Sequence, residues 1–439
     1  GYIRSDIYKC EDIYKELIEK QESMREYAIK TYMENGYSIS LPTLYVDNEK
    51  IGLFKSYITA FKIYNQLMKL DKEESLFEPF TEDEMNQSIT KTEQELGFHF
   101  TEEQRSAIKS INERNVIVVT APAGAGKSSC IKGILNLLKT ARVKDSFLER
   151  YREQQELESG EQCVRSEMDV RIGQCALSAK AARRIREVSG ESASTMHRIL
   201  GASSTGFFYN SLTPMPYAVN VWDEASMVNE ELTLSYLNAI LPQSKLIIIF
   251  DFAQLPPIGS GDFTRDILLS KLHINKFTKV HRQGEKSGIL MDANKIRVGT
   301  NPLKGEDFSS KIVHGELQDM LYFMCSDKKA MQDLAIKAYM SAIKKTGVED
   351  TVIITPRKQN CVNSTLELNK IIQERVLPNE NQFIERKTKG KECKFKLGAK
   401  VMQKKNDYDK QVFNGDEGYI VEVKNDSIVV CLIPARTNT

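Results

Sequence analysis

A short loop near residue 120 constrains the fold of this chain more than any other stretch. Residues 120–129 read T-A-P-A-G-A-G-K-S-S, which is close to the phosphate-binding pattern G-x-x-x-x-G-K-[ST]. The apolar run N-V-I-V-V-T (115–120) precedes the loop and C-I-K-G-I-L-N-L-L follows it, so the pattern predicts a buried strand, a turn and a helix. This context favours nucleotide binding over an ordinary glycine-rich turn.

The residue types in the loop suit a nucleotide phosphate. Gly124 and Gly126 let successive backbone N–H groups turn toward one anion. Lys127 would contact the β- and γ-phosphates, and the Ser128 hydroxyl would ligate Mg²⁺. Ala121 stands where the pattern has its first glycine, and we expect alanine to be tolerated there unless the backbone needs a positive φ. The predicted nucleotide-binding residues of the loop are Ala123, Gly124, Ala125, Gly126, Lys127, Ser128 and Ser129.

Strand and helix patterns alternate after the loop. Further apolar runs occupy residues 174–178, 217–222, 245–250 and 350–355, with helix patterns between them. Such alternation predicts an α/β fold in which helices cover a parallel sheet. The length of 439 residues fits about two to four domains.

Composition narrows the class of protein. No apolar run approaches the roughly 18 residues that cross a bilayer, so we expect a cytoplasmic protein of bacterial or phage type without membrane contact. The eight cysteines form no C-x-x-C pair, which argues against a zinc site or a disulfide framework. The net charge of +1 still permits a local basic stripe that binds nucleic acid.

Two carboxylates follow a second predicted strand. The run V-N-V-W-D-E-A-S-M (219–227) delivers Asp223 and Glu224 to the carboxyl end of that strand. Asp223 would hold the Mg²⁺ shell, and Glu224 would orient and deprotonate the attacking water. Gln254, in I-I-I-F-D-F-A-Q-L-P-P-I-G (247–259), follows a third strand and would sense the γ-phosphate. These residues predict hydrolysis rather than phosphoryl transfer to a small acceptor.

Three segments together resemble superfamily 1 DNA helicases: D-E-A-S-M (223–227), D-F-A-Q-L-P-P (251–257) and V-H-R-Q (280–283). The similarity is greatest to the RecD-like branch, whose members move 5′ to 3′ on single-stranded DNA. This resemblance implies tandem RecA-like P-loop motor domains with parallel sheets, an N-terminal helical domain and the start of an SH3-like β module. It also implies ATP and Mg²⁺ as cofactors.

The resemblance also implies roles for single residues. Gln104, in F-T-E-E-Q-R-S-A-I (100–108), matches the glutamine that reads adenine, and Arg282 matches the arginine that reaches the γ-phosphate from the second motor domain. Arg183 and Arg184 either contact DNA phosphates or simply solvate a helix face. The implied DNA contacts are Ser178 and Lys180 in A-L-S-A-K (176–180), Thr195 and His197 in A-S-T-M-H (193–197), and Asn414 within segment 397–418.

The predicted domain order follows from these matches. An N-terminal helical accessory domain (1–95) contains helix patterns over 10–29 and 53–70, separated by an extended segment and turn over 41–52. It is followed by a first motor domain (96–275), a partial second motor domain (276–412) and the start of the β module (413–439). The first motor domain carries a charged insertion (140–172) and a hairpin at about 203–217, which in the family acts as a pin that splits the duplex.

Some positions depart from the family pattern. The DNA-contacting motif reads A-L-S-A-K in place of A-P-T-G-K, and Phe250 stands where the third motif usually has glycine. Two later motifs, a serine–glutamine–glycine run and a threonine–arginine finger, do not occur in the sequence, so we expect the natural chain to be longer.

The leading prediction is an ATP-dependent 5′-to-3′ single-stranded DNA translocase or helicase. Its implied partners are single-stranded DNA and junctions with duplex DNA, together with a single-stranded-DNA-binding protein or a nuclease. A nucleotide-gated DNA-binding or scaffold subunit that does not unwind is the alternative. An RNA-directed motor is a third reading, because these motifs do not visibly read the 2′-hydroxyl.

Overall fold

The computed structural model describes residues 3–4, 44–47, 50–122, 124–144, 171–203, 205–259, 261–278, 286–307, 311–377, 382–388, 391–404, 407, 410, 412 and 415–433. The chain divides into two units, of which the first runs to residue 281 and includes the last three residues, and the second runs from 282 to 436. The phosphate-loop sequence and both predicted carboxylates belong to the first unit.

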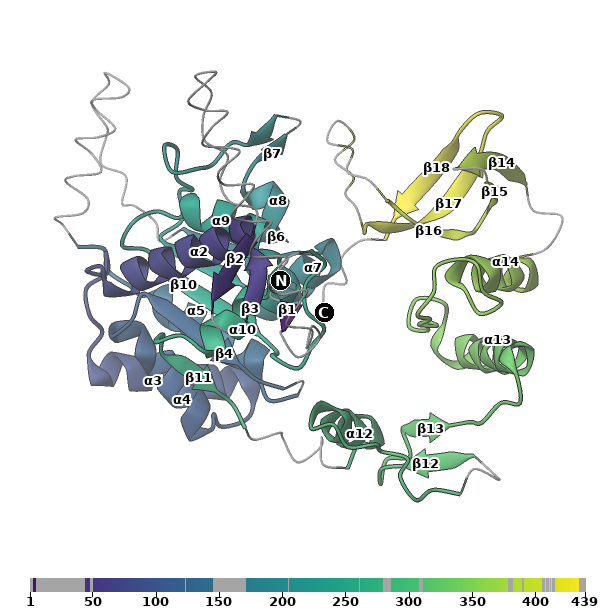
Figure 1. The fold of residues 1–439 in the computed structure, drawn as a ribbon, viewed down its shortest axis with the longest axis horizontal. Coiled ribbons are helices and arrows are strands. Elements are labelled where there is room, and N and C mark those ends of the chain that lie inside the picture. The colour runs from purple at the N-terminus through teal and green to yellow at the C-terminus, as the bar shows by residue number, and fades with distance from the viewer. Residues whose placement is uncertain are drawn as a thin grey trace. The chain divides into compact units, whose positions relative to one another are not determined.

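A parallel sheet forms the centre of the first unit (Figure 1). Its six strands are β4 Val116–Thr120, β5 Ile172–Ala176, β6 Ala193–Thr195, β9 Val219–Trp222, β10 Lys245–Phe250 and β11 Ile274–Lys276. Their spatial order is β11, β4, β10, β9, β5, β6, and every neighbouring pair is parallel. The strands predicted near 115–120, 174–178, 217–222 and 245–250 are confirmed, as is the α/β class.

Helices cover both faces of this sheet, and every residue of β4, β9 and β10 is buried. Successive strand residues point to opposite faces, so a strand covered on both sides is apolar almost throughout. Val119 and Ile249 face a core shared with α3 Glu82–Leu96, α4 Glu102–Lys109 and α5 Lys127–Leu138. Val118 and Ile248 face a core shared with α2 Phe54–Lys72, α8 Met196–Ile199, α9 Glu230–Asn238 and α10 Phe263–Leu268.

The helices before residue 96 belong to these two cores. Leu67 of α2 and Ile89 of α3 are each 1% exposed, on opposite sides of the sheet. β3 Lys50–Leu53 lies between β1 Ile3–Arg4 and β2 Leu44–Asp47 and pairs with both. Together with α2, β2 and β3 confirm the extended segment and helix predicted over 41–70. The helix predicted over 10–29, and residues 145–170 of the charged insertion, lie outside the described residues.

Shorter elements complete the first unit. α7 follows β5 and is strongly amphipathic, and a two-residue hairpin lies in the region predicted to carry the pin. The turn after β9 is a 3₁₀ helix, as is the turn after α4. Their bounds are η2 Ser110–Asn112, α7 Ala179–Ser189, β7 Ala202–Ser203, β8 Gly206–Phe207 and η3 Ala225–Met227.

The second unit contains separate helices and small antiparallel sheets. Its elements are α12 Gly288–Arg297, β12 Ile312–His314, β13 Met320–Tyr322, α13 Lys328–Thr346, α14 Thr365–Val376, β14 Phe383–Thr388, β15 Lys391–Lys396, β16 Lys400–Met402, β17 Glu417–Val423 and β18 Ile428–Leu432. The strands β16, β17 and β18 form one antiparallel sheet, and Lys424 N–H donates to the Ser427 carbonyl across the predicted Asn425-Asp426 turn.

The strand predicted over residues 350–355 is wrong for this structure. Residues 351–355 have no regular secondary structure, and Val352 and Ile354 are 76% and 90% exposed. A strand needs a neighbour to satisfy its N–H and C=O groups. Within the described part of the second unit, all strand pairs are antiparallel pairs of other segments, and none lies beside these residues.

Candidate nucleotide-hydrolysis site

The sheet order brings three predicted site segments to one edge. β10 lies between β4 and β9, with Ile248 paired to Val118 on one side and to Trp222 on the other. Neighbouring strands are about 4.8 Å apart, so the segments that leave the carboxyl ends of these three strands lie within roughly 10 Å of one another. The phosphate loop, the Asp223-Glu224 pair and the Gln254 segment therefore share one edge of the sheet, where open α/β sheets bind ligands.

The phosphate loop has the backbone that anion binding requires. Gly124 and Gly126 both have φ of 78°, a left-handed conformation that favours glycine. Ala121 is fully buried, its N–H donates to the Phe250 carbonyl at 3.2 Å, and its φ is not among the positive values of the described residues. Alanine is therefore tolerated at this position, as predicted. Ala123 lies outside the described residues.

Lys127 is the first residue of α5, and its ammonium lies over the loop. The Nζ atom donates to the Ala121 carbonyl at 2.8 Å and is 3.4 Å from the Pro122 carbonyl. Ser128 and Ser129 occupy the first turn of α5 and are half-buried. The first N–H groups of a helix have no partner within it, so this end of α5 attracts an anion.

Asp223 is held where β9 ends. Its N–H donates to the Cys175 carbonyl of β5 at 3.0 Å. Burial raises the pKa of Asp223 to about 6; the Glu224 N–H, Lys127 and Arg184 act in the opposite direction, while the Glu224 carboxylate adds to the rise. Positive charge from a cation would favour the ionised carboxylate, which suits this residue to a metal site. The effect of Arg184 on Asp223 is a link that sequence reasoning missed.

Glu224 adopts a strained conformation beside Asp223. Its φ of 51° and ψ of 41° lie in the left-handed region, which costs a non-glycine residue about 1–2 kcal/mol. Its N–H donates to Asp223 Oδ1 at 2.8 Å, whereas its own Oε2 is buried without a hydrogen-bond partner among the described residues. Strain and an orphaned buried carboxylate oxygen together are typical of a functional position.

Gln254 is linked to the segment that follows the carboxylates. Ser226 Oγ, in η3, donates to Gln254 Oε1 at 3.3 Å. The Gln254 backbone N–H donates to the Asp251 carbonyl at 3.1 Å, which shapes the turn after β10. Ser226 was missed as a site residue, although its place two residues after Glu224 in D-E-A-S-M was visible. Gln254 is exposed on the same edge as the phosphate loop.

Gln104 is the most enclosed of the predicted nucleotide contacts. It is 1% exposed, and Thr101 caps α4 through the predicted capping box with Gln104. Gln104 Oε1 accepts from the Thr101 N–H at 2.9 Å, and Nε2 donates to the Ala125 carbonyl at 3.1 Å. Both ends of this amide are thus bonded within the protein.

The predicted DNA contacts near β5 and β6 also lie at this edge. Ser178 caps α7 by accepting from the Ala181 N–H, and Thr195 caps α8 by accepting from the Arg198 N–H. Lys180 is exposed on α7, and the exposed His197 ring lies 6.1 Å from the Phe207 ring of the small hairpin. Arg282 and Asn414 lie outside the described residues, so their roles stay predictions.

The donor set fits Mg²⁺ held jointly with a nucleotide. Among the described residues, no group of three or more His, Cys, Asp or Glu side chains could hold a metal ion by itself. Mg²⁺ is usually bound by one or two carboxylates, waters and substrate phosphates, so Asp223 and Ser128 are a sufficient protein contribution.

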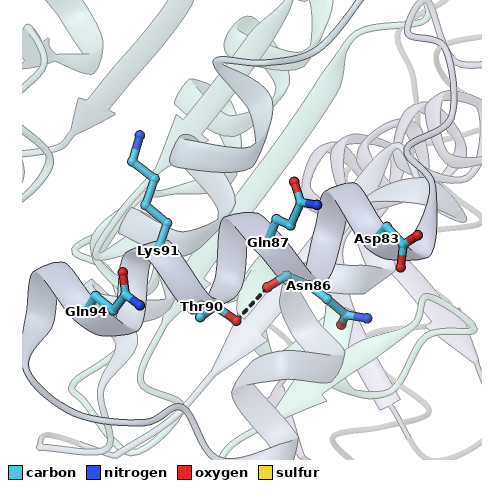
Figure 2. A pocket seen from close by; sticks show the side chains of 6 residues that line it. All are labelled: Asp83, Asn86, Gln87, Thr90, Lys91 and Gln94. Carbon is cyan, nitrogen blue, oxygen red and sulfur yellow. Dashed lines mark hydrogen bonds between the residues drawn. The ribbon is translucent and has the colours of Figure 1, made fainter.

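A shallow polar depression lies elsewhere, on the outer side of α3 (Figure 2). All its lining side chains come from that one helix: Asp83, Asn86, Gln87, Thr90, Lys91 and Gln94. Thr90 Oγ1 donates to the Asn86 carbonyl within the same helix. A single solvated helix face encloses no ligand, so we assign this depression no role.

Two family models match this chain, and the first covers the sheet and the segments at its carboxyl edge. The family model described as an AAA domain matches residues 99–318, and the model described as the ATP-dependent RecD-like DNA helicase SH3 domain matches residues 368–432. The second match begins well before residue 413, so it includes most of α14 and all of β14–β16, which the sequence analysis assigned to the second motor domain.

Curated relatives carry helicase names. The chain is 27% identical over 331 residues to the ATP-dependent RecD2 DNA helicase of Deinococcus radiodurans, which covers 75% of this chain and 39% of the relative. It is 28% identical over 219 residues to the RecBCD enzyme subunit RecD of Mycolicibacterium smegmatis, covering 45% of this chain and 36% of that one. The chain thus spans less than two fifths of the length of either relative.

Solved structures of Pif1 helicases are also similar. A study of DNA unwinding at forked duplexes by two coordinating Pif1 helicases contains a chain with a TM-score of 0.42 and 18% identity, covering 77% of this chain and 75% of that one. Bacteroides Pif1 bound to single-stranded DNA has a TM-score of 0.40 and 17% identity, with coverages of 76% and 71%. Because the AAA-domain match takes in half of the sequence, the chain belongs to the AAA-domain family, and its residues 368–432 are similar to the SH3 domain of RecD-like DNA helicases.

Proposed function

We propose that this chain is the ATP-hydrolysing part of a 5′-to-3′ single-stranded DNA translocase or helicase. The observation that carries the proposal is the meeting of three strand ends: the phosphate loop after β4, Asp223 and Glu224 after β9, and Gln254 after β10. A nucleotide bound to this loop has a carboxylate pair and a γ-phosphate sensor on the adjacent segments.

Each residue has a defined part in hydrolysis. Lys127 would exchange its loop carbonyls for phosphate oxygens. Asp223 and Ser128 would hold Mg²⁺, which would supply positive charge to the phosphates. Glu224 accepts a proton from the attacking water through Oε2, which has no hydrogen-bond partner in the described part of the chain. Burial raises the pKa of Asp223, and a cation held beside this carboxylate would favour its ionised form.

The link from Gln254 to Ser226 couples hydrolysis to motion. A change in the γ-phosphate shifts Gln254, and the hydrogen bond passes that shift to η3, immediately after Glu224. DNA is held by phosphate contacts from Lys180 and by Thr195 and His197, without sequence preference. The small hairpin β7–β8, followed by the exposed Phe208 and Leu212, would separate the duplex.

The nucleotide-gated scaffold remains the second candidate function. The N-cap of α7 favours this candidate. Ser178 takes the place of the family's threonine, and its hydroxyl oxygen accepts from the Ala181 N–H. We therefore expect DNA contacts at this position to differ from those of the family. Nucleotide binding with DNA binding, but without turnover, is the behaviour that this candidate requires.

The decisive experiment measures ATP hydrolysis with and without single-stranded DNA, followed by unwinding of duplexes that carry a 5′ or a 3′ tail. Stimulated hydrolysis, with unwinding from the 5′ tail alone, is the expected result. Lys127→Ala is the inactive comparison, and Lys132→Ala, in the same helix and paired with Glu95 at 3.1 Å, is the matched control that stays active. Binding of DNA and ATP without any turnover would establish the scaffold instead.

A further inference from the structure

Residues 276–278, at the end of β11 and just after it, contact three different segments of the candidate site. Lys276 Nζ lies over the Phe252 ring, 5.5 Å from its centre, in the turn that follows β10. The Phe277 N–H donates to the Thr120 carbonyl at 3.0 Å, directly before the phosphate loop. The turn after β10 and the start of the phosphate loop are therefore both in contact with the end of β11.

The third contact joins Thr278 to Glu103, in the first turn of α4, a helix that lies beside β11 (Figure 1). The Thr278 N–H donates to Glu103 Oε2 at 2.9 Å, and the Thr278 hydroxyl donates to Oε1 at 2.6 Å. Hydrogen bonds to a carboxylate are stronger than neutral ones, and two together fix the orientation of Thr278. Thr278 is exposed, so this contact can open without disturbing either apolar core.

The turn that holds Thr278 is also bonded to the phosphate loop. Gln104, next to Glu103 in the chain, donates from Nε2 to the Ala125 carbonyl at 3.1 Å. The Gln104 amide has a second N–H and a second acceptor lone pair, so this bond leaves it able to contact a nucleotide as well. The first turn of α4 thus connects the loop to Thr278 through two adjacent side chains.

The chain leaves the first unit shortly after these contacts. Asn275 Nδ2 donates to the Val118 carbonyl at 3.2 Å, and Phe277 is 2% exposed and belongs to one of the two apolar cores. The division between the units falls between residues 281 and 282. Among the described residues, Thr278 is the last one before that crossing, so its bonds to Glu103 hold the beginning of the connecting segment.

We propose that residues 276–278 are a coupling element that carries nucleotide binding to the segment entering the second unit, and that Glu103 is its positioning residue. The inference rests on the proposed function, because it assumes that the site binds ATP. A bound nucleotide fixes the loop, the turn after β10 and the first turn of α4 together, so all three contacts hold. Without nucleotide, the exposed bonds between Glu103 and Thr278 open more often.

The test measures hydrogen exchange by mass spectrometry on the full chain, with and without Mg²⁺ and AMP-PNP, an ATP analogue that is not hydrolysed. In the wild type, AMP-PNP should slow exchange roughly fivefold in peptides that contain Thr278, because its N–H donates to Glu103. Glu103→Ala removes both acceptors and Thr278→Val removes the hydroxyl donor, so both variants should lose most of this slowing. Equal slowing in wild type and Glu103→Ala, or none in the wild type, would overturn the proposal.

Two control variants separate this contact from a general effect on α4 or on β11. Glu102→Ala removes an exposed carboxylate from the same helical turn, and Thr278→Ser keeps both donors. Both should behave as the wild type. Because the pair of Glu103 and Thr278 is at the surface, its loss should change the melting temperature little. Loss of the slowing in Glu102→Ala as well would assign the effect to the charge of the helix end and refute the role of Glu103.

Calorimetry supplies a second readout, because coupling between two sites is reciprocal. If AMP-PNP strengthens the contact roughly fivefold, loss of the contact should weaken AMP-PNP by no more than that factor. Glu103→Ala and Thr278→Val should therefore bind AMP-PNP up to about fivefold more weakly than the wild type. A much larger loss in Glu103→Ala alone would mean that Glu103 acts on the nucleotide directly and would contradict the coupling role.

The readouts also distinguish this inference from the proposed function. A chain that shows Glu103-dependent slowing but never hydrolyses ATP keeps the inference and loses the proposed function. A chain whose DNA-stimulated hydrolysis is intact, but whose exchange at Thr278 ignores AMP-PNP, keeps the function and loses the inference. A wild-type chain that does not bind AMP-PNP in the calorimeter loses both.

Discussion

The two units of this chain differ in the contacts that stabilise them. In the first, the central strands are buried at every residue between two apolar cores, and the site segments leave one edge of the sheet. In the second, the described contacts include a buried polar cluster: Asp292 of α12 accepts from His314 Nδ1 at 2.6 Å and from the Tyr322 hydroxyl at 2.9 Å. That cluster joins α12 to the hairpin β12–β13.

This difference explains where the predicted site forms. A sheet packed on both sides gives its strand ends fixed positions, which hydrolysis needs because geometry contributes strongly to the rate. Apolar residues in the second unit are less enclosed, as Val352 and Ile354 show. We therefore expect substitutions in the first unit to act on chemistry and global stability, and those in the second unit to act locally.

The largest expected effect is on turnover. Glu224→Gln removes the proposed base while keeping the shape of the side chain, so ATP hydrolysis should fall by about 10²–10⁴-fold with ATP binding retained. Steady-state hydrolysis and calorimetric binding measure the two properties. Glu231→Gln, on the exposed side of α9 and ion-paired with the exposed Lys55 at 2.6 Å, is the control. Unchanged turnover in Glu224→Gln would contradict the general-base assignment.

The next largest effect is on the free energy of unfolding, when an isoleucine is truncated to alanine in each of the two units. Ile248 is fully buried, so Ile248→Ala leaves a cavity in the core of the first unit. This change should lower the free energy of unfolding by about 2–5 kcal/mol. Ile354→Ala, at a position 90% exposed, should change it by less than about 0.5 kcal/mol. Trp222 is the single tryptophan and is buried in β9, so its fluorescence during urea unfolding reports on the first unit, and far-UV circular dichroism reports on both units. Similar costs for both variants would remove the contrast between the units.

A smaller effect concerns the free energy of unfolding, which the buried Asp223 carboxylate lowers when it is ionised. Burial raises the pKa of Asp223 from 3.8 to about 6. The folded state therefore binds the proton more tightly, and the stabilisation present below about pH 4 is lost as pH rises through 6. Asp223→Asn in EDTA should be more stable than wild type above pH 6, by up to about 3 kcal/mol, and nearly equal to it at pH 4. A difference that does not change with pH would exclude this origin.

The smallest effect tests the polar cluster of the second unit. Burial opposes ionisation of Asp292, but hydrogen bonds from His314 and Tyr322 outweigh it and lower its pKa. Its contribution to stability is therefore present above about pH 4 and is lost as pH falls further. Asp292→Asn should cost roughly 1–3 kcal/mol at pH 7. Hydrogen exchange should increase in peptides from 286–307 and not in β4 or β10; a global increase would contradict local action.

Much of the first unit could be predicted because its signals are local. Unbroken apolar runs marked β4, β9 and β10, and the capping box at Thr101 and Gln104 was confirmed. The strand expected over 350–355 shows the limit, since an apolar run forms a strand only where a neighbour can pair with it. The bond from Ser226 to Gln254 could not be predicted either, because it depends on the turn that η3 makes.

The sequence by itself determined the chemistry of this protein: a phosphate loop, a carboxylate pair and a glutamine, each directly after an apolar run. Only the tertiary structure decided which neighbours those groups have. It set β10 between β4 and β9, enclosed Gln104 against the Ala125 carbonyl, and buried Glu224 Oε2 where none of the described residues is its hydrogen-bond partner. The physical reason is that residue type fixes what a group can donate or accept, whereas distance and burial depend on how segments far apart in the chain pack together.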